Sequence, residues 1–218
     1  MTLGRRIAAE ALGTALLLAT VIGSGIMGER LAAGNVAIAL LANSIATGAS
    51  LYALIVAFGP VSGAHFNPVV TLVVALNKQM RWREAIAYTC AQLAGAFAGV
   101  VAAHAMFGEF LFVASRHQRS GAALWWAEGV ATFGLLLVIL GSARQNLPAI
   151  AAAVGAYITA AYWFTASTSF ANPAVTLART ASDTFAGIRP ADAPAFVLAQ
   201  LAGALVAAGV MRWLDSEK

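Results

Sequence analysis

Apolar residues run in long blocks along the chain, and most charged residues lie in the short breaks between these blocks. A helix needs about 20 residues to cross the hydrocarbon core of a bilayer. Six blocks reach that length, and each predicts a membrane-spanning helix: 6–28, 35–58, 83–106, 122–142, 147–168 and 192–214. We therefore expect an all-α integral membrane protein whose first block is its first span and not a cleaved signal.

Two further apolar pieces, in SGAHFNPVVTLVVA and STSFANPAVTLART, are too short to span and follow the second and fifth blocks. Each contains Asn-Pro, at Asn67-Pro68 and at Asn172-Pro173. Asparagine is a good N-cap, and proline suits the first helical position because its missing N–H would have no partner there. Short, proline-interrupted apolar segments at matching places indicate a transport site. They predict two re-entrant half-helices that meet N-terminus to N-terminus.

The chain is an internal duplication. The stretch AEALGTALLLATVIGSG corresponds to AEGVATFGLLLVILGSA, which aligns Glu10 with Glu128, and AQLAGA occurs once in each half. The predicted repeats are 1–106 and 120–218 within a single channel domain. Each repeat holds three spans, and an odd number makes the second copy enter the membrane from the opposite side. We expect an inverted three-plus-three arrangement.

Composition supports a lipid environment for this chain of 218 residues, of which 61% are hydrophobic and only 10% charged. Globular proteins average about 45–50% apolar and about 25% charged residues. The net charge of +4 comes from scattered basic residues, so no nucleic-acid partner is expected. The lone Cys90 lies in an apolar run and is interpreted as a packing residue.

Basic residues in short loops favour the cytoplasmic side of a membrane. With both termini in the cytoplasm of a cell's inner membrane, the inner side holds more of the 13 Lys and Arg than the outer side. The inner set is Arg5, Arg6, Lys78, Arg81, Arg83, Arg144, Arg212 and Lys218, and the outer set is Arg30, Arg116, Arg119, Arg179 and Arg189. We expect a multi-pass protein in that orientation.

Facing half-helices would set the chemistry of a pore. Each helix N-terminus carries about half a positive charge, so two of them at the centre repel cations, hydronium included. The amides of Asn67 and Asn172 offer N–H donors to a passing oxygen. A water molecule held by both points its hydrogens away from the centre, which interrupts proton conduction. The pattern predicts passage of neutral polar solutes and exclusion of ions.

These motifs resemble those of the aquaporin, or major intrinsic protein, family over essentially the whole chain. The resemblance rests on two Asn-Pro-Ala-type motifs in inverted halves, SGAHFNP before the first, and the paired acids. It implies a homotetramer with a pore in each subunit and no cofactor. It also implies that Glu10 and Glu128 accept hydrogen bonds from the re-entrant loops, and that His65 braces the first loop. A proton-coupling role for the acids is the alternative.

No metal site is expected, because no second ligand stands at a metal-site spacing from His65. His104 and His117 have no predicted role. The re-entrant segments hold no Ser/His pair with an evident oxyanion donor, which argues against a membrane-embedded hydrolytic enzyme. We therefore expect no enzymatic activity.

Both motifs depart from the family pattern. Val69 stands where the first motif usually has alanine, whereas Ala174 keeps it in the second. Family members usually carry an arginine three residues after the second Asn, where it forms a narrow selectivity filter. Here that position is Val175.

Ungapped counting from the family's spacing places the other filter positions at Thr47, Ala160 and Ser169. Phe164 or Tyr157 would enter the filter if the count is displaced. Thr47, Ala160 and Ser169, with the valine, are small and uncharged, so they imply a wide and weakly polar constriction.

Arg179 follows Val175 by four residues, about one helical turn. It is interpreted either as an arginine that snorkels to the outer surface or as a displaced filter charge at the outer mouth, and the first interpretation is preferred. The expected function is a passive channel for water and small uncharged solutes such as glycerol-like polyols. The resemblance further implies neutral metalloid hydroxides such as arsenous acid, which the residues alone do not single out. A water-selective channel is the alternative, and a coupled secondary transporter is a further one.

Overall fold

All regular elements in residues 1–215, which the computed structural model describes, are helical. The last three residues of the second expected repeat, Lys218 among them, lie outside this range. The long helices are α1 (Leu3–Leu31), α2 (Val36–Ser62), α4 (Trp82–Phe107), α5 (Ala122–Gly141), α6 (Leu147–Phe164) and α8 (Ala193–Asp215). The short ones are α3 (Pro68–Leu76), α7 (Pro173–Arg179) and the 3-10 turn η1 (Pro190–Asp192).

The described chain has six helices that are long and apolar enough to cross a membrane, as predicted. Two boundaries differ from the sequence prediction by four residues, more than any other. Helix α2 continues to Ser62, past the expected end at 58, with Pro60 inside it. Helix α6 ends at Phe164 and not at 168, so the segment that leads into the second Asn-Pro motif is longer than expected.

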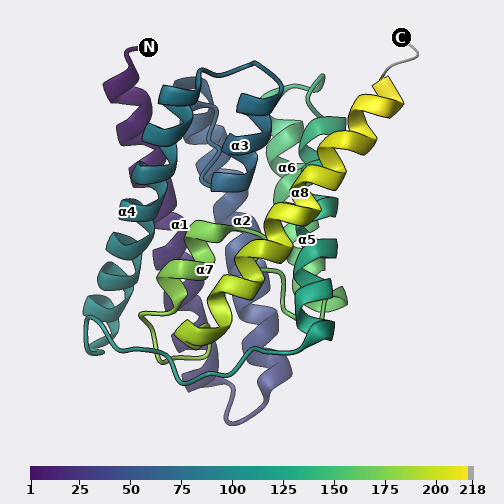
Figure 1. The fold of residues 1–218 in the computed structure, drawn as a ribbon. Coiled ribbons are helices and arrows are strands. Elements are labelled where there is room, and N and C mark those ends of the chain that lie inside the picture. The colour runs from purple at the N-terminus through teal and green to yellow at the C-terminus, as the bar shows by residue number, and fades with distance from the viewer. Residues whose placement is uncertain (216–218) are drawn as a thin grey trace.

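The two halves are inverted relative to one another. In Figure 1 the N-terminus and the described end of α8 lie at one end of the bundle, which we call the terminal end. The short helix α3 runs from the middle toward this terminal end, whereas α7 runs from the middle toward the opposite, or far, end (Figure 1). The predicted arrangement of six spans and two half-helices is confirmed.

Both half-helices begin where the asparagine caps require. The Oδ1 atom of Asn67 accepts a hydrogen bond of 3.1 Å from the backbone N–H of Val69. The Oδ1 atom of Asn172 accepts equivalent bonds from Ala174 (2.9 Å) and Val175 (3.3 Å). Each cap thus satisfies N–H groups that have no partner within the helix.

Glycines allow the long helices to approach closely in equivalent pairs. Helix α4 packs on α1, and α8 packs on α5. A Cβ atom at Gly95 would collide with the carbonyl oxygen of Ala11, and one at Gly203 would collide with that of Gly129. Both glycines belong to the repeated AQLAGA, and both carbonyls directly follow the paired glutamates. Small residues at such crossings are typical of membrane helix pairs.

We predict that Gly203→Ala destabilises the protein, because its new methyl group meets backbone and not a movable side chain. Overpacking of this kind typically costs about 1–3 kcal/mol. Thermal unfolding in detergent measures the effect, with Gly209→Ala as the control, since a Cβ there has no atom within 4 Å. Equal unfolding temperatures for the two variants would contradict the close-packing account.

Candidate functional site

The two half-helix caps are joined to each other at the centre of the molecule. The Nδ2 of Asn67 donates to the carbonyl oxygen of Ala171, and the Nδ2 of Asn172 donates to that of Phe66, both at 2.8 Å. A side-chain amide has two N–H donors. Each asparagine therefore uses one donor on the opposite loop, and among the described residues its second donor has no partner. Both side chains line a cavity between the two halves.

The loops that enter these caps share an unusual backbone conformation. Ala64 and Phe66 have φ of 50° and 48°, and the equivalent Ser169 and Ala171 have φ of 51° and 48°. Side chains other than glycine rarely adopt this left-handed region, and local strain of order 1–3 kcal/mol per residue persists only where the surroundings enforce it. The loops therefore need a partner that fixes their backbone N–H groups.

Glu10 on α1 is that partner for the first loop. Its side chain is fully buried, and its Oε1 accepts from the hydroxyl of Ser62 (2.6 Å) and the backbone N–H of His65 (3.0 Å). Its Oε2 accepts from the backbone N–H of Phe66 (2.8 Å) and from Nε2 of Gln92 (2.8 Å). A carboxylate this deep is stable only with such partners. The contacts agree with the predicted bracing role.

Glu128 on α5 makes the equivalent contacts with the second loop. It is also fully buried. Its Oε1 accepts from the N–H of Phe170 and its Oε2 from that of Ala171, both at 2.9 Å. Oε2 also accepts from Nε2 of Gln200 at 2.6 Å. Both oxygens of each glutamate thus accept a backbone N–H group of the loop beside it.

Sequence reasoning missed the glutamines. Nε2 of Gln92 also donates to the hydroxyl of Thr71 (2.9 Å), and Nε2 of Gln200 to that of Thr176 (2.8 Å). Each threonine in turn donates to the carbonyl of the capping asparagine. The signal was present, because each glutamine is the second letter of AQLAGA and each threonine lies in Val-Thr-Leu after the motif.

His65 lies beside this first network. Its Nδ1 is 3.0 Å from the hydroxyl of Thr71, and its ring packs edge-on against Tyr88 with centroids 5.5 Å apart. These contacts are those of a residue that braces the loop. Residues 1–215 contain no cluster of three potential metal ligands.

The cavity has a volume of about 270 Å³. Toward the terminal end its walls are mostly aliphatic, with His65 among them, whereas more polar side chains lie at its centre and far end. Of the residues selected from the sequence, those that line it are Thr47, His65, Asn67, Ser169, Asn172, Val175 and Arg179. Pro68, Val69, Pro173 and Ala174 are absent from the lining; they form the first turns of the half-helices behind it.

Ala160 does not take the expected filter position, and this assignment is corrected. It lies on the exposed face of α6, whereas Val154, Ile158 and Tyr162 line the cavity at every fourth residue. The Tyr162 hydroxyl shares a hydrogen bond of 3.2 Å with that of Thr47. Beside Thr47, α6 therefore contributes Tyr162 to the cavity wall and not Ala160. Neither alternative, Phe164 or Tyr157, lines the cavity.

Arg179 does not snorkel to the surface, so the preferred interpretation of this residue is wrong. Its side chain is buried, with 2% exposed, and lines the cavity. Its guanidinium carbon lies 3.4 Å from the centre of the Phe170 ring, and its Nε donates to the carbonyl of Ala186. The chain thus carries a guanidinium one turn beyond the valine.

A second arginine near this place was not anticipated. Arg119, in the segment between α4 and α5, lies 5.1 Å from the Phe170 ring centre. Its Nε donates to the carbonyl of Gly187 at 2.8 Å, and its terminal nitrogens point to the carbonyls of Ser167 and Phe185. It therefore ties the second re-entrant loop to the far-end loops. Such a contact between distant segments leaves no local sequence signal.

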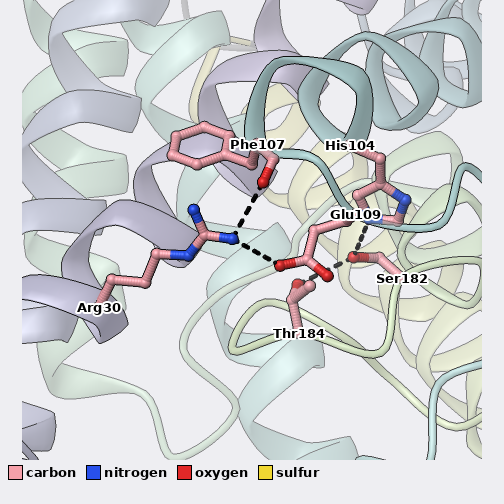
Figure 2. A network of polar contacts seen from close by, with 6 residues as sticks. All are labelled: Arg30, His104, Phe107, Glu109, Ser182 and Thr184. Atoms are coloured by element: carbon pink, nitrogen blue, oxygen red, sulfur yellow. Dashed lines mark hydrogen bonds and ion pairs between the residues drawn. The ribbon is translucent and has the colours of Figure 1, made fainter.

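His104 also has a role that the sequence did not predict. In Figure 2 it joins Ser182, and Ser182 joins Thr184, both through 2.8 Å hydrogen bonds. Nearby, Arg30 binds Glu109 at 2.8 Å and the carbonyl of Phe107 at 3.0 Å (Figure 2). The network fixes the loop that follows α7 against the end of α4, so it holds the far end of the half-helix in place.

Comparison with known families and sequences agrees with this geometry. The family model described as Major intrinsic protein matches residues 1–146 and 110–218. The chain is 56% identical over 212 residues to Aquaglyceroporin AqpS of Rhizobium meliloti (strain 1021), which covers 97% of this chain and 91% of that protein. It is 30% identical over 254 residues to Aquaporin AqpM of Methanothermobacter marburgensis, with full coverage of both.

A solved structure has the same fold. The X-ray structure of the aquaglyceroporin from Plasmodium falciparum matches with a TM-score of 0.76 and covers 95% of each chain. The sequences are 19% identical. At this identity the similarity speaks for the arrangement of helices and not for the substrate.

We predict that Glu128→Gln destabilises the fold and lowers any solute flux. The amide replaces one acceptor oxygen with a donor that faces the N–H groups of the loop, and each buried donor left without a partner costs about 1–3 kcal/mol. Thermal unfolding in detergent measures the loss, and Glu29→Gln, at an exposed position, is the control. Unchanged stability combined with altered pH dependence of uptake would favour a proton-coupling role instead.

Proposed function

Because the chain belongs to the major intrinsic protein family, we propose that it is a passive channel for water and small uncharged solutes. The single observation that carries this is the central cavity, where Asn67 and Asn172 each present one unused donor beside the uncharged wall that Val175 provides. The protein is a multi-pass membrane protein with six spans.

Ion exclusion follows from how the half-helices point. Both N-termini face the centre, and their partial positive charges oppose cations, including hydronium. A water or hydroxyl oxygen at the centre accepts from Asn67 and Asn172 and turns its hydrogens outward. The wall toward the terminal end is mostly aliphatic, with His65 among its residues, and offers few groups that could replace an ion's hydration shell. A neutral solute loses much less free energy than an ion when its hydration is reduced.

The solutes we propose are glycerol-like polyols and neutral metalloid hydroxides such as arsenous acid. Thr47, Ser169 and Val175 provide the small part of the far-end wall, and Tyr162 supplies a hydroxyl partner for a polar solute. The name of the Rhizobium meliloti relative supports the class, since it is called an aquaglyceroporin. The proposal concerns this class and not one physiological substrate.

A water-selective channel is the second candidate, and one observation favours it. Tyr162 and Arg179 place a phenol and a guanidinium in the far-end wall of the cavity. The filter expected from the sequence contained only small, uncharged residues. A coupled secondary transporter has less support. The two acids inside the spans, Glu10 and Glu128, are both engaged by the loops they brace.

We further propose that the protein resides in a cell's inner membrane as a homotetramer, with both termini in the cytoplasm. Large apolar side chains exposed on the long helices support contact with lipid or with neighbouring subunits, for example Leu12, Ile45, Ile86, Trp126 and Leu205. The greater number of basic residues at the terminal end supports the orientation. The two repeats, 1–106 and 120–218, are proposed as one channel domain.

Stopped-flow light scattering on proteoliposomes tests the solute class. After a shock with glycerol or arsenous acid, vesicles with the protein should first shrink and then swell again faster than protein-free vesicles, whereas sucrose should give shrinkage alone. Fast water flow without solute entry would favour the water-selective candidate and contradict the proposed class.

We predict that Val175→Arg restricts glycerol more than water. An arginine there adds a long charged side chain to the wall beside Asn172, which occludes a three-carbon solute before a single water molecule. The glycerol permeability should fall at least about tenfold, a barrier increase of about 1.4 kcal/mol, while water permeability changes by a smaller factor. Val175→Leu controls for bulk without charge. Equal losses of both permeabilities would refute the filter assignment.

We predict that Asn172→Asp weakens cation rejection. The carboxylate cancels part of the positive potential of the half-helix N-termini and removes the donor that binds Phe66. Sodium and proton leak into proteoliposomes, read by entrapped fluorescent indicators, should rise above the level of the original protein. Leak at that original level, in a variant that still folds, would show that the asparagines and dipoles do not exclude cations.

A further inference from the structure

The guanidinium of Arg179 is a buried charge with unused donors. In the part of the chain that the structure describes, its one hydrogen bond runs from Nε to the carbonyl of Ala186. The two terminal nitrogens have no hydrogen-bond partner there, and the side chain lines the cavity while only 2% of it is exposed. A charge removed from water is costly unless an opposite charge or hydrogen bonds compensate it. The terminal N–H groups of the guanidinium are therefore available to donate hydrogen bonds to a bound acceptor.

Three acids near the far end are already engaged, whereas Glu29 in the same region is exposed and forms no ion pair with a described residue. Asp183 pairs with Arg116 at 2.8 Å, Asp192 with Arg189 at 2.8 Å, and Glu109 with Arg30 at 2.8 Å. Glu128 accepts from the backbone of the second loop and from Gln200. Thus no carboxylate in residues 1–215 forms an ion pair with Arg179.

A second cation strengthens the positive field at this mouth. Arg119 lies against the same Phe170 ring, and its guanidinium donates to carbonyl groups and to no carboxylate of the described chain. The positive charges of the two arginines also affect the pKa of the neighbouring His117. Burial, and after it the cations of Arg119 and Arg179, lower the pKa of His117, although Glu29 and Asp183 act in the opposite direction.

A hydroxyl group completes the cluster. The Oγ of Ser169 is buried, lines the same cavity and has no hydrogen-bond partner among the described residues. The hydroxyl of Tyr162 lies in the same wall. A guanidinium fork and hydroxyl groups that line one cavity suit the oxygens of a small oxyanion, which accept several charge-assisted hydrogen bonds at once.

We propose that Arg179, with Ser169, forms a binding site for a small inorganic oxyanion of the phosphate class, and that the bound anion plugs the channel from its far end. The anion satisfies the unused donors of the guanidinium and does not proceed, because the mostly aliphatic wall beyond the asparagines, where His65 also lies, offers too few groups to replace its hydration. A neutral solute loses its path while the anion is present. The plugging step rests on the proposed channel function, whereas the binding step does not.

Calorimetric titration of the purified full-length protein in detergent with inorganic phosphate tests the site, with chloride at equal ionic strength as the blank. We expect saturable binding to the original protein, about tenfold weaker binding to Arg179→Gln, and unchanged binding to Arg116→Gln, which alters an exposed and already paired arginine of the same end. No binding by the original protein, or equal binding by Arg179→Gln, overturns the site.

Two further variants keep the test decisive if the first one does not fold. Should Arg179→Gln fail to fold, Arg179→Lys keeps the charge and Ser169→Ala keeps the guanidinium, and each should weaken phosphate binding several-fold. Unchanged binding in both folded variants overturns the assignment.

Glycerol swelling of proteoliposomes with and without external phosphate tests the plug. The rate for the original protein should fall to about half or less at saturating phosphate, and the rate for Arg179→Gln should not change. Calorimetric binding without inhibition of swelling overturns the plug alone. Absence of glycerol swelling without phosphate counts against the proposed channel function, while the calorimetry still decides the site.

Discussion

Two buried carboxylates hold the central part of this molecule together. A re-entrant loop in a membrane has backbone N–H groups that lipid cannot satisfy, and each such group costs several kcal/mol. Glu10 and Glu128 accept those N–H groups, and Gln92 and Gln200 connect each carboxylate to the half-helix that follows. This contact fixes the left-handed loop residues and therefore the place where the two half-helices meet.

The chemistry of the cavity follows from that meeting point. Because the half-helix N-termini face one another, their positive ends and the amides of Asn67 and Asn172 share one small volume. Close helix packing through Gly95 and Gly203 brings the supporting helices near enough for their side chains to reach the loops. Far from the centre, Arg179 adds a full charge one helical turn beyond Val175, which stands where family members usually carry an arginine. The proposed exclusion of cations would thus have two sources, the half-helix dipoles and the Arg179 guanidinium.

Local sequence predicted much of this arrangement. Span length, Asn-Pro caps and duplicated letters are local or periodic signals, so they located the six spans and both half-helices. Counting residues back from Asn172 failed to find the filter position on α6. The helix ends at Phe164, and loop residues after it adopt left-handed conformations, so the count does not follow a regular helix. It selected Ala160, whereas Tyr162 lines the cavity. The contacts of Arg119 join segments that are distant along the chain, and no spacing rule anticipates them.

The central claim is that a neutral solute passes where a charge cannot, and glycerol and proton flux in the same vesicles test it most directly. Proteoliposomes that contain an entrapped pH indicator would be given a glycerol gradient and a pH gradient in turn. The account predicts glycerol entry well above that of protein-free vesicles, with proton leak equal to theirs. Proton leak that rises together with glycerol entry would contradict it, because the half-helix N-termini and Arg179 would then fail to exclude charge.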